Sequence, residues 1–323
     1  MVDMTNKRLS VAPMIDWTTT DYRYFARIFN PHVYLYTEMI STGALIHGNR
    51  ARHLRFDDLE HPLVLQLGGA DITEMTQCAE FAQQYGYDEV NINVGCPSDR
   101  VQHNKIGACL MAEPNTVADL VKHMQAAIDI PVTVKHRIGI DDFDSYEFMA
   151  DFVQTVAAGG CTRFIVHART AWLQGLSPKQ NREIPPLRYE DVYRLKQDFP
   201  TLDIEINGGI ESIADIEAHL KHIDGVMIGR AFYHNPYLLA EANSLWDDPI
   251  PRRSDILAQL YPYLEEQIAK GEALPTMTRH YLGLFQGLMG ARKWRQALSG
   301  KPHLTIDDIK HAATEVLALN PDA

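Results

Sequence analysis

Short apolar segments recur along the first 230 or so residues, and most are followed by a longer stretch with helical periodicity. Alternating or continuous apolar runs bounded by turn residues predict strands, and apolar positions spaced three and four apart predict helices. The predicted strands are Leu9–Ile15, Val33–Met39, Leu63–Leu67, Val90–Val94, Val132–Lys135, Phe164–His167, Ile204–Asn207 and Val226–Ile228. The predicted helices are Asp21–Phe29, Ile72–Tyr85, Thr116–Ile128, Ser145–Ala158, Tyr189–Asp198 and Ser212–Lys221, with a shorter, less clear connection around Thr42–His47.

This alternation of eight strands with helices predicts an α/β protein with a (β/α)₈ TIM barrel, a fold that typically takes about 250 residues. The competing fold is a doubly wound sheet. That fold usually has about five or six strands and a GxGxxG turn, and the sequence contains no such turn. The pattern therefore favours the barrel.

The strand signals stop after Pro236, and residues 247–253 have the prolines and charges of a linker. Ser254 and Asp255 predict the start of a helix that runs to about Lys270. Further helices are predicted at Met277–Met289, Gly290–Leu298 and Ile306–Leu317. We therefore expect a barrel domain over residues 1–245 and a small all-α domain over residues 246–323.

The composition is that of a soluble globular protein, with 46% hydrophobic and 22% charged residues among 323. No apolar run approaches the ~18 residues that would cross a membrane, and residues 1–8 lack the apolar core of a signal peptide. We expect a cytoplasmic protein. The four cysteines form no CxxC pair and have no metal-like spacing with histidine, so neither disulfides nor a metal site is expected; they are Cys78, Cys96, Cys109 and Cys161.

The basic residues are unevenly distributed, although the net charge is −12. Two stretches contain no Asp or Glu: residues 152–182, with Arg163, Arg169, Lys179 and Arg182, and residues 273–306, with Arg279, Arg292, Lys293, Arg295 and Lys301. In an acidic chain, such stretches are the expected footprint of a local polyanion site, and ordinary solvated faces are the alternative. Arg292 and Arg295 are three residues apart, so a helix would place them on one face.

Chemistry is expected at the carboxyl ends of the strands, where the loops of a barrel converge. The strand over Val90–Val94 runs into Gly95-Cys96-Pro97, which predicts a sharp turn with Cys96 at its corner. A cysteine that merely packs is the alternative.

Glycine pairs and a cation follow other strands. Asn207-Gly-Gly209 and Gly229-Arg230 end the last two strands, the usual phosphate-binding position of this fold. Lys135 lies at the end of a buried strand, where a cation is costly without an anionic partner. The partner would be the negative charge near N1 of a reduced flavin, or the lysine would form a Schiff base. His167 is either a packing residue or a functional one.

Taken in order, these motifs resemble the tRNA-dihydrouridine synthases over nearly the whole chain. They are Ala12-Pro-Met14, Thr37-Glu-Met39, Gln66-Leu-Gly-Gly69, Asn93-Val-Gly-Cys-Pro97, Lys135-His-Arg137, His167-Ala-Arg169, Asn207-Gly-Gly209 and Gly229-Arg230. The segments 167–179 and 290–295 resemble the bacterial A subfamily, which modifies positions 20 and 20a of the D-loop.

The resemblance implies an oxidoreductase with an FMN-binding barrel and a helical tRNA-binding domain. The residues at the family's FMN positions are Pro13, Met14, Ile15, Gln66, Lys135, His167, Asn207, Gly208, Gly209, Gly229 and Arg230. Family enzymes reduce the uracil C5=C6 bond with hydride from reduced flavin, and Cys96 matches the proton donor to C5. An ordinary thiol suits that role, because it is mostly protonated at neutral pH yet can give up its proton.

The target base must be flipped out of the tRNA, at a cost of a few kcal/mol that phosphate contacts offset. The expected tRNA-binding residues are Asn93 and Arg169 at the flipped base, together with Lys179, Arg182, Arg292 and Arg295. No second nucleotide-binding domain is visible, so NADPH, the family's reductant, is expected to reach the same flavin face as tRNA in ping-pong turnover.

Three other functions remain open on the sequence. A flavin dehydrogenase of the dihydroorotate type shares the barrel, the lysine and the phosphate loops, but it leaves the helical domain and the acid-free stretches unexplained. The others are a Lys135 Schiff-base lyase without flavin and a tRNA-binding module without catalysis. A yellow purified protein would exclude the lyase, and tRNA-dependent flavin reoxidation would exclude the other two.

Overall fold

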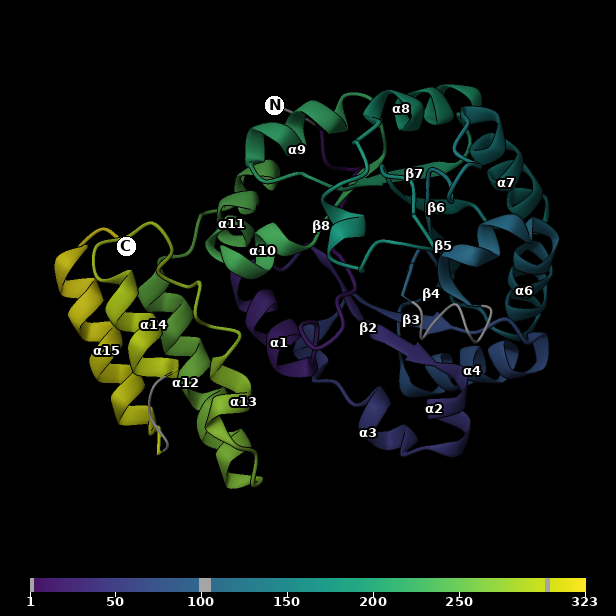
Figure 1. Ribbon diagram of the computed structural model, residues 1–323. Coiled ribbons are helices and arrows are strands. Elements are labelled where there is room, and N and C mark those ends of the chain that lie inside the picture. Colours follow the sequence, from purple (N-terminus) through teal and green to yellow (C-terminus); the bar gives the residue numbers. More distant parts are fainter. Residues whose placement is uncertain (1–2, 99–105, 300–302) are drawn as a thin grey trace.

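The computed structural model describes residues 3–98, 106–299 and 303–323 (Figure 1). Within these residues, eight parallel strands pair in chain order and close into a barrel, with the last strand beside the first. The strands are β1 (Arg8–Val11), β2 (Tyr34–Ser41), β3 (Leu63–Gly68), β4 (Glu89–Val94), β5 (Val132–Arg137), β6 (Arg163–His167), β7 (Asp203–Asn207) and β8 (Gly225–Ile228). The predicted (β/α)₈ barrel is confirmed.

Helices surround the barrel (Figure 1). They are α1 (Thr20–Phe29), α2 (Thr42–His47), α3 (Arg50–Leu54), α4 (Ile72–Tyr85), α6 (Pro114–Ala127), α7 (Tyr146–Ala158), α8 (Tyr189–Asp198), α9 (Ile213–Leu220), α10 (Arg230–His234) and α11 (Tyr237–Glu241). Short 3₁₀ turns are η1 (Asp58–Glu60), η2 (Gly107–Ala112), η3 (Gln180–Arg182) and η4 (Ala242–Trp246). Side-chain caps start several helices; for example, Asp71 accepts a hydrogen bond from the Glu74 amide at the start of α4.

The remaining helices are α12 (Arg253–Ala269), α13 (Leu274–Thr278), α14 (Ala291–Ser299) and α15 (Ile306–Leu319), and they lie together at one side of the barrel (Figure 1). The Tyr24 ring of α1 stacks on Tyr263 of α12 at 3.8 Å, and the Tyr263 hydroxyl donates to Asp21 Oδ1 at 2.8 Å. These contacts fix the helical part against the barrel. The predicted boundary between the two domains, at residues 245 and 246, falls within η4, and this boundary stays a prediction.

Three predicted boundaries were wrong. The first strand ends at Val11 rather than at Ile15, because Pro13 has no N–H for the ladder and the chain turns from there. The long helix expected at Met277–Met289 is limited to α13, followed by turns in which Gly287 and Gly290 have positive φ. Helix α12 begins at Arg253, so Ser254 and Asp255 lie inside it rather than capping it.

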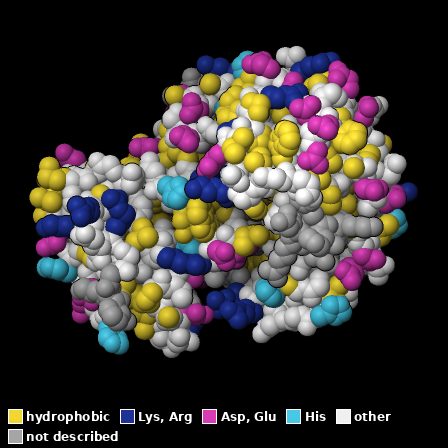
Figure 2. Space-filling view, in the orientation of Figure 1, with side chains coloured by type: hydrophobic (Ala, Val, Ile, Leu, Met, Phe, Trp, Pro, Cys, Tyr) yellow, Lys and Arg dark blue, Asp and Glu magenta, His cyan; other side chains and the backbone are white. Residues whose placement is uncertain are grey.

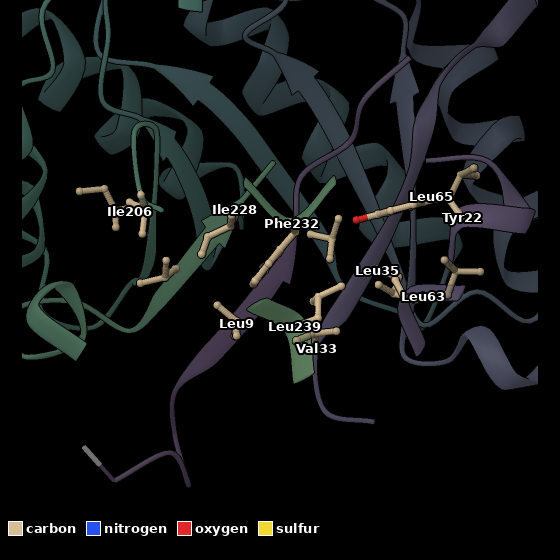
Figure 3. Packing of buried hydrophobic residues seen from close by; sticks show 14 of the residues in the cluster. Leu9, Tyr22, Val33, Leu35, Leu63, Leu65, Ile206, Ile228, Phe232 and Leu239 are labelled. Atoms are coloured by element: carbon tan, nitrogen blue, oxygen red, sulfur yellow. The ribbon is translucent and has the colours of Figure 1, made fainter. Parts of the chain in front are cut away.

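The main hydrophobic core lies between the strands and the surrounding helices. Leu9, Leu35 and Leu65 from the strands belong to the same buried cluster as Phe232 of α10 and Leu239 of α11 (Figure 3). Burying each such side chain contributes roughly 1.5–3 kcal/mol. This shell holds the barrel closed and leaves its axis for other side chains.

A buried polar network runs through the barrel interior, beside a small apolar cluster of Ala12, Tyr36, Val64, Ile165 and Met227. Arg8 pairs with Glu89 at 2.7 Å and with Glu205 at 3.1 Å near the amino ends of the strands. From Glu89 a series of side-chain hydrogen bonds of 2.7–2.9 Å leads toward the carboxyl ends of β3 and β4. The donors and acceptors are Thr133 to Glu89, Asn91 to Thr133, Gln66 to Asn91 and Asn93 to Gln66. Gln66 and Asn93, near the carboxyl ends of β3 and β4, are thus held in fixed positions.

In the part of the chain that the structure describes, no helix is both long and apolar enough to span a bilayer. Over the same residues, no three His, Cys, Asp or Glu side chains gather in a way that could hold a metal ion.

Candidate active site

A cavity of about 410 Å³ opens at the carboxyl ends of the strands. Every residue that the sequence assigned to the flavin lines it: Pro13, Met14, Ile15, Gln66, Lys135, His167, Asn207, Gly208, Gly209, Gly229 and Arg230. Cys96, Asn93 and Arg182 line it as well. Residues that are far apart in the sequence meet here because all eight strands point their carboxyl ends to the same side.

The turn that carries Cys96 is shaped by Asn93. The Oδ1 atom of Asn93 accepts hydrogen bonds from the backbone N–H groups of Gly95, at 3.1 Å, and of Cys96, at 3.0 Å. Gly95 does not adopt a positive φ, so the turn does not depend on the backbone freedom of glycine that the sequence suggested. The Cys96 thiol lies 3.6 Å from the Ser98 hydroxyl and faces the cavity.

Lys135 is the cation on the cavity wall at the end of β5. Its Nζ donates to Asn207 Oδ1 at 3.1 Å, and among the described residues it has no carboxylate partner within ion-pair distance. Burial and, after it, the nearby Arg137 guanidinium lower the pKa of Lys135 to about 7. An anion in the cavity would restore the charged form of this lysine.

Arg137 is two residues further along β5, on the same face as Lys135. Its Nε donates to the Gly95 carbonyl at 3.2 Å, and one of its terminal nitrogens donates to the Asn181 carbonyl at 2.9 Å. Arg137 therefore ties the Cys96 turn to the loop between β6 and α8 (168–188, the β6–α8 loop). The sequence indicated Arg137 only as part of a motif; its period-two spacing from Lys135 was the signal that could have placed it in the site.

His167, at the end of β6, carries a neutral ring at physiological pH. Burial, followed by the charges of Arg137 and Lys135, holds the pKa of His167 well below its usual range. A neutral imidazole can both donate and accept a hydrogen bond toward a ligand in the cavity.

The Gly208–Gly209 turn after β7 requires glycine at both positions. Both residues have positive φ, 120° and 69°. A Cβ on Gly208 would lie 2.9 Å from the His167 ring, and one on Gly209 would lie 2.5 Å from a Leu187 methyl group. The turn therefore presents bare backbone to the cavity. Gly229 has no positive φ, and a Cβ there would meet Met14 Sδ at 3.3 Å.

Arg230 opens α10 and lines the cavity, but its guanidinium is already engaged. One terminal nitrogen lies 2.7 Å from Glu183 Oε1, and the other lies 3.4 Å from the Arg182 carbonyl. A phosphate contact would use its remaining N–H groups or displace Glu183.

The expected tRNA-binding residues of the first acid-free stretch do not all gather at the cavity. Arg182 lines it, whereas Arg169 and Lys179 do not. Arg169 instead donates to the Pro185 carbonyl within the β6–α8 loop. Arg163 lies at the opposite end of the barrel, paired with Asp203 at 2.9 Å and Glu205 at 3.3 Å. The absence of acids along the sequence did not prevent those partners, because they come from the neighbouring strand.

The basic residues of the second acid-free stretch, 273–306, also lie in different places. Arg292 and Arg295 lie on the exposed face of α14, opposite the buried Trp294, as their spacing predicted. Figure 2 shows basic side chains on the helical part as well as on the barrel. Arg279 donates to the Asp16 carbonyl at 2.8 Å, which links the helical part to the loop after β1. Lys301 lies outside the described residues.

Asp16 and Trp17 also lie on the cavity wall and were not among the predicted site residues. The Trp17 ring stacks on Tyr233 at 4.1 Å, and Asp16 adopts a positive φ of 65°. These two residues directly follow the Ala12-Pro-Met14 motif and Ile15, so including the rest of that loop would have found them.

A closed parallel barrel with polar side chains converging on a cavity at its carboxyl end defines the architecture of TIM-barrel enzymes. A model of the family described as "Dihydrouridine synthase (Dus)" matches residues 10–315 of this sequence. The chain belongs to the dihydrouridine synthase family, and the resemblance read from the motifs is confirmed.

Curated relatives cover most of the chain. A tRNA-dihydrouridine(20/20a) synthase of Vibrio parahaemolyticus is 56% identical over 300 residues, which is 92% of each chain. One of Pseudomonas aeruginosa is 55% identical over 318 residues, covering 97% of this chain and 96% of the relative.

Solved structures share the fold at low identity. A 2-naphthoyl-CoA reductase aligns with a TM-score of 0.59 at 12% identity, over 73% of this chain and 50% of that one. Morphinone reductase aligns with a TM-score of 0.52 at 13% identity, over 77% and 88%.

Proposed function

We propose that this protein is an FMN-dependent tRNA-dihydrouridine synthase that reduces uridines 20 and 20a of the D-loop, with NADPH as reductant. Membership of the dihydrouridine synthase family supports a flavin enzyme acting on uridine, and the names of the relatives supply the positions. The observation that carries the proposal is the position of Cys96, fixed by Asn93 on a cavity that also holds Lys135 and the Gly208–Gly209 turn.

The cavity suits a flavin mononucleotide. Gly208 and Gly209 have no room for a Cβ beside His167 and Leu187, so the turn on the cavity wall is bare backbone, which favours a group held by backbone N–H donors. Lys135, without a carboxylate partner among the described residues, meets the need of an anionic cofactor for a cation. Pro13 to Ile15, Gln66, His167 and the Gly229-Arg230 pair complete the proposed binding set.

A bound flavin supplies the hydride for the pyrimidine double bond, and the residues of the chain supply the proton and the geometry. Cys96 Sγ donates the proton to C5 of the uracil. Asn93 fixes the Cys96 amide, and Arg137 fixes the Gly95 carbonyl, so the thiol is aimed before the substrate arrives. Asn93 uses one amide hydrogen on Gln66, which leaves the other for the flipped base.

The basic side chains offset the cost of flipping the base. Arg169, Lys179 and Arg182 come from the β6–α8 loop, and Arg292 and Arg295 come from α14. NADPH and tRNA use the same cavity in turn. A tRNA-modifying enzyme of this kind acts in the cytoplasm.

The deciding experiment measures colour, reoxidation and product. The purified protein should show flavin absorbance, should be reduced by NADPH, and should be reoxidised anaerobically by unmodified tRNA. Dihydrouridine should then map to positions 20 and 20a. A colourless protein would favour the Lys135 lyase, and flavin without tRNA-dependent reoxidation would favour a small-metabolite dehydrogenase or a non-catalytic module.

Charge reversal of Arg292 and Arg295 should weaken tRNA binding and leave NADPH-dependent flavin reduction unchanged. These side chains lie on the exposed face of α14, and neither lines the cavity. Losing phosphate contacts should also flatten the plot of log affinity against log salt by ~0.7–0.9 per contact. The measurement is the tRNA Kd at several salt concentrations.

The matched control reverses the charges of Lys122 and Lys221. Both lysines are exposed; Lys122 lies on α6, and Lys221 follows the last residue of α9. This variant carries the same change in net charge and should keep the salt slope of the unmodified protein. If both double variants lower the affinity alike, the effect is one of overall charge and α14 does not contact the RNA.

A further inference from the structure

Trp172 differs from the other tryptophans of the chain. Trp17 stacks on Tyr233, Trp246 stacks on His32 at 4.6 Å, and Trp294 packs edge-on against Phe285 at 5.0 Å. Trp172 is 46% exposed, and within the described residues its ring has no aromatic or cationic partner. Single exposed apolar residues are common, so exposure alone does not identify a site.

The backbone of Trp172 is held by a buried amide. Asn181 is fully buried; its Oδ1 accepts the Trp172 N–H at 2.7 Å and its Nδ2 donates to the Trp172 carbonyl at 2.9 Å. The same Nδ2 lies 3.2 Å from the Leu176 carbonyl. The exposed indole therefore stands on an ordered backbone, so binding a partner costs less entropy than it would on a loose loop.

The same asparagine connects Trp172 to the active site. Its carbonyl accepts the hydrogen bond from Arg137, which also holds the Gly95 carbonyl next to Cys96. The following residue, Arg182, lines the cavity. The backbone of Trp172 is thus fixed with respect to the Cys96 turn through only two intervening residues.

The charges around Trp172 indicate the kind of partner. Trp172 lies in the acid-free stretch 152–182, in the same loop as Arg169, Lys179 and Arg182. Figure 2 shows apolar side chains exposed on the barrel face in view, with both basic and acidic side chains among them. A planar apolar ring among cations is the combination that binds unpaired nucleotides, with the bases on the ring and the phosphates on the cations.

Phe143, in the loop after β5, provides a contrast. It is 63% exposed, more than Trp172, but its sequence neighbours are Asp141, Asp142 and Asp144. A polyanion would be repelled there. The two exposed aromatic residues lie on adjacent loops. The Asp141 amide donates to the Ala171 carbonyl at 2.9 Å, and the Asp141 carboxylate accepts the Leu173 N–H at 2.7 Å, so this acid lies beside both residues and the difference in charge rests on Asp142 and Asp144.

We propose that Trp172 is a stacking platform for an unpaired tRNA base next to the uridine held in the cavity. This inference rests on the proposed function and adds a residue that binds and orients the RNA. Stacking is indifferent to base identity, so Trp172 contributes affinity and position rather than sequence readout.

The test compares Trp172→Ala, Trp172→Phe and Phe143→Ala. We expect Trp172→Ala to weaken tRNA binding about 5- to 100-fold, the usual worth of one base stacked on an aromatic ring. Trp172→Phe keeps a ring and should retain most of the affinity, and Phe143→Ala should bind as the unchanged protein does. Flavin content and NADPH-dependent reduction should be the same in all three.

Tryptophan fluorescence gives an independent readout, because base stacking quenches an exposed indole. Adding tRNA to the unchanged protein should quench part of the emission, and Trp172→Phe should lose most of that quenching while still binding tRNA. Equal tRNA affinity in Trp172→Ala and the unchanged protein, or quenching in Trp172→Phe as large as in the unchanged protein, would overturn the inference. Absence of dihydrouridine formation by the unchanged protein would overturn the proposed function instead, since tRNA affinity is measured separately.

Discussion

Replacing Cys96 with alanine should slow reoxidation of the reduced flavin by tRNA roughly 10²–10⁴-fold, the usual contribution of a positioned general acid. Flavin binding and the NADPH half-reaction should remain largely intact. The thiol faces the cavity, and its turn is held by the Asn93 side chain, whose bonds go to backbone N–H groups that alanine retains. Single-turnover reoxidation under anaerobic conditions measures the effect.

Cys109 provides the matched control. It is half-buried like Cys96 and lies in η2, whose Ala108 amide donates to the Cys96 carbonyl at 2.9 Å, but it does not line the cavity. Cys109→Ala should reoxidise at the rate of the unchanged protein. If Cys96→Ala turns over tRNA almost as fast as that control, then Cys96 is not the proton donor.

The contents of the cavity could be predicted from the sequence because the fold itself aligns them. A residue at the carboxyl end of a predicted strand must lie at one end of the barrel, whichever strand it ends. Lys135, His167 and Asn207 were placed at that end by this rule, and the family resemblance then assigned them, together with Gln66, to the flavin. An error of a few residues in a strand boundary, as at Ile15, did not move a residue away from that end.

The contacts between loops could not be predicted in the same way. Arg137 with Asn181 and Arg279 with Asp16 join residues 44 and 263 positions apart, and no local pattern specifies such partners. The same limit explains Arg163, whose carboxylate partners come from β7. The shape of the Cys96 turn was assigned to Gly95, but it depends on where the Asn93 side chain points, which strand alternation does not determine.

Replacing Lys135 with alanine should weaken FMN binding about ten- to a hundredfold, the range expected for losing a hydrogen bond to a charged group. Lys135 lies on the cavity wall and is hydrogen-bonded to Asn207, and nothing in the described structure pairs it with a carboxylate. The variant should therefore purify with little flavin. Lys196→Ala is the control, since this lysine is also partly buried but pairs with Asp224 outside the cavity.

The pH dependence of FMN affinity separates the charge of Lys135 from its packing. Burial and Arg137 lower the pKa of Lys135 to about 7 in the free protein, and a bound anion favours the protonated form, so its pKa rises in the complex. Below about pH 7 the lysine is charged in both states, and its contribution to binding is fully present. Above that pH, binding must take up a proton, so the contribution falls as the pH rises toward the pKa of the complex. Free FMN titrates identically in both measurements, so the difference in affinity between the unchanged protein and Lys135→Ala reports on the lysine. If the two affinities run parallel from pH 6 to 9, or if Lys135→Ala retains its flavin and is reduced at the unchanged rate, then Lys135 does not hold the cofactor's charge.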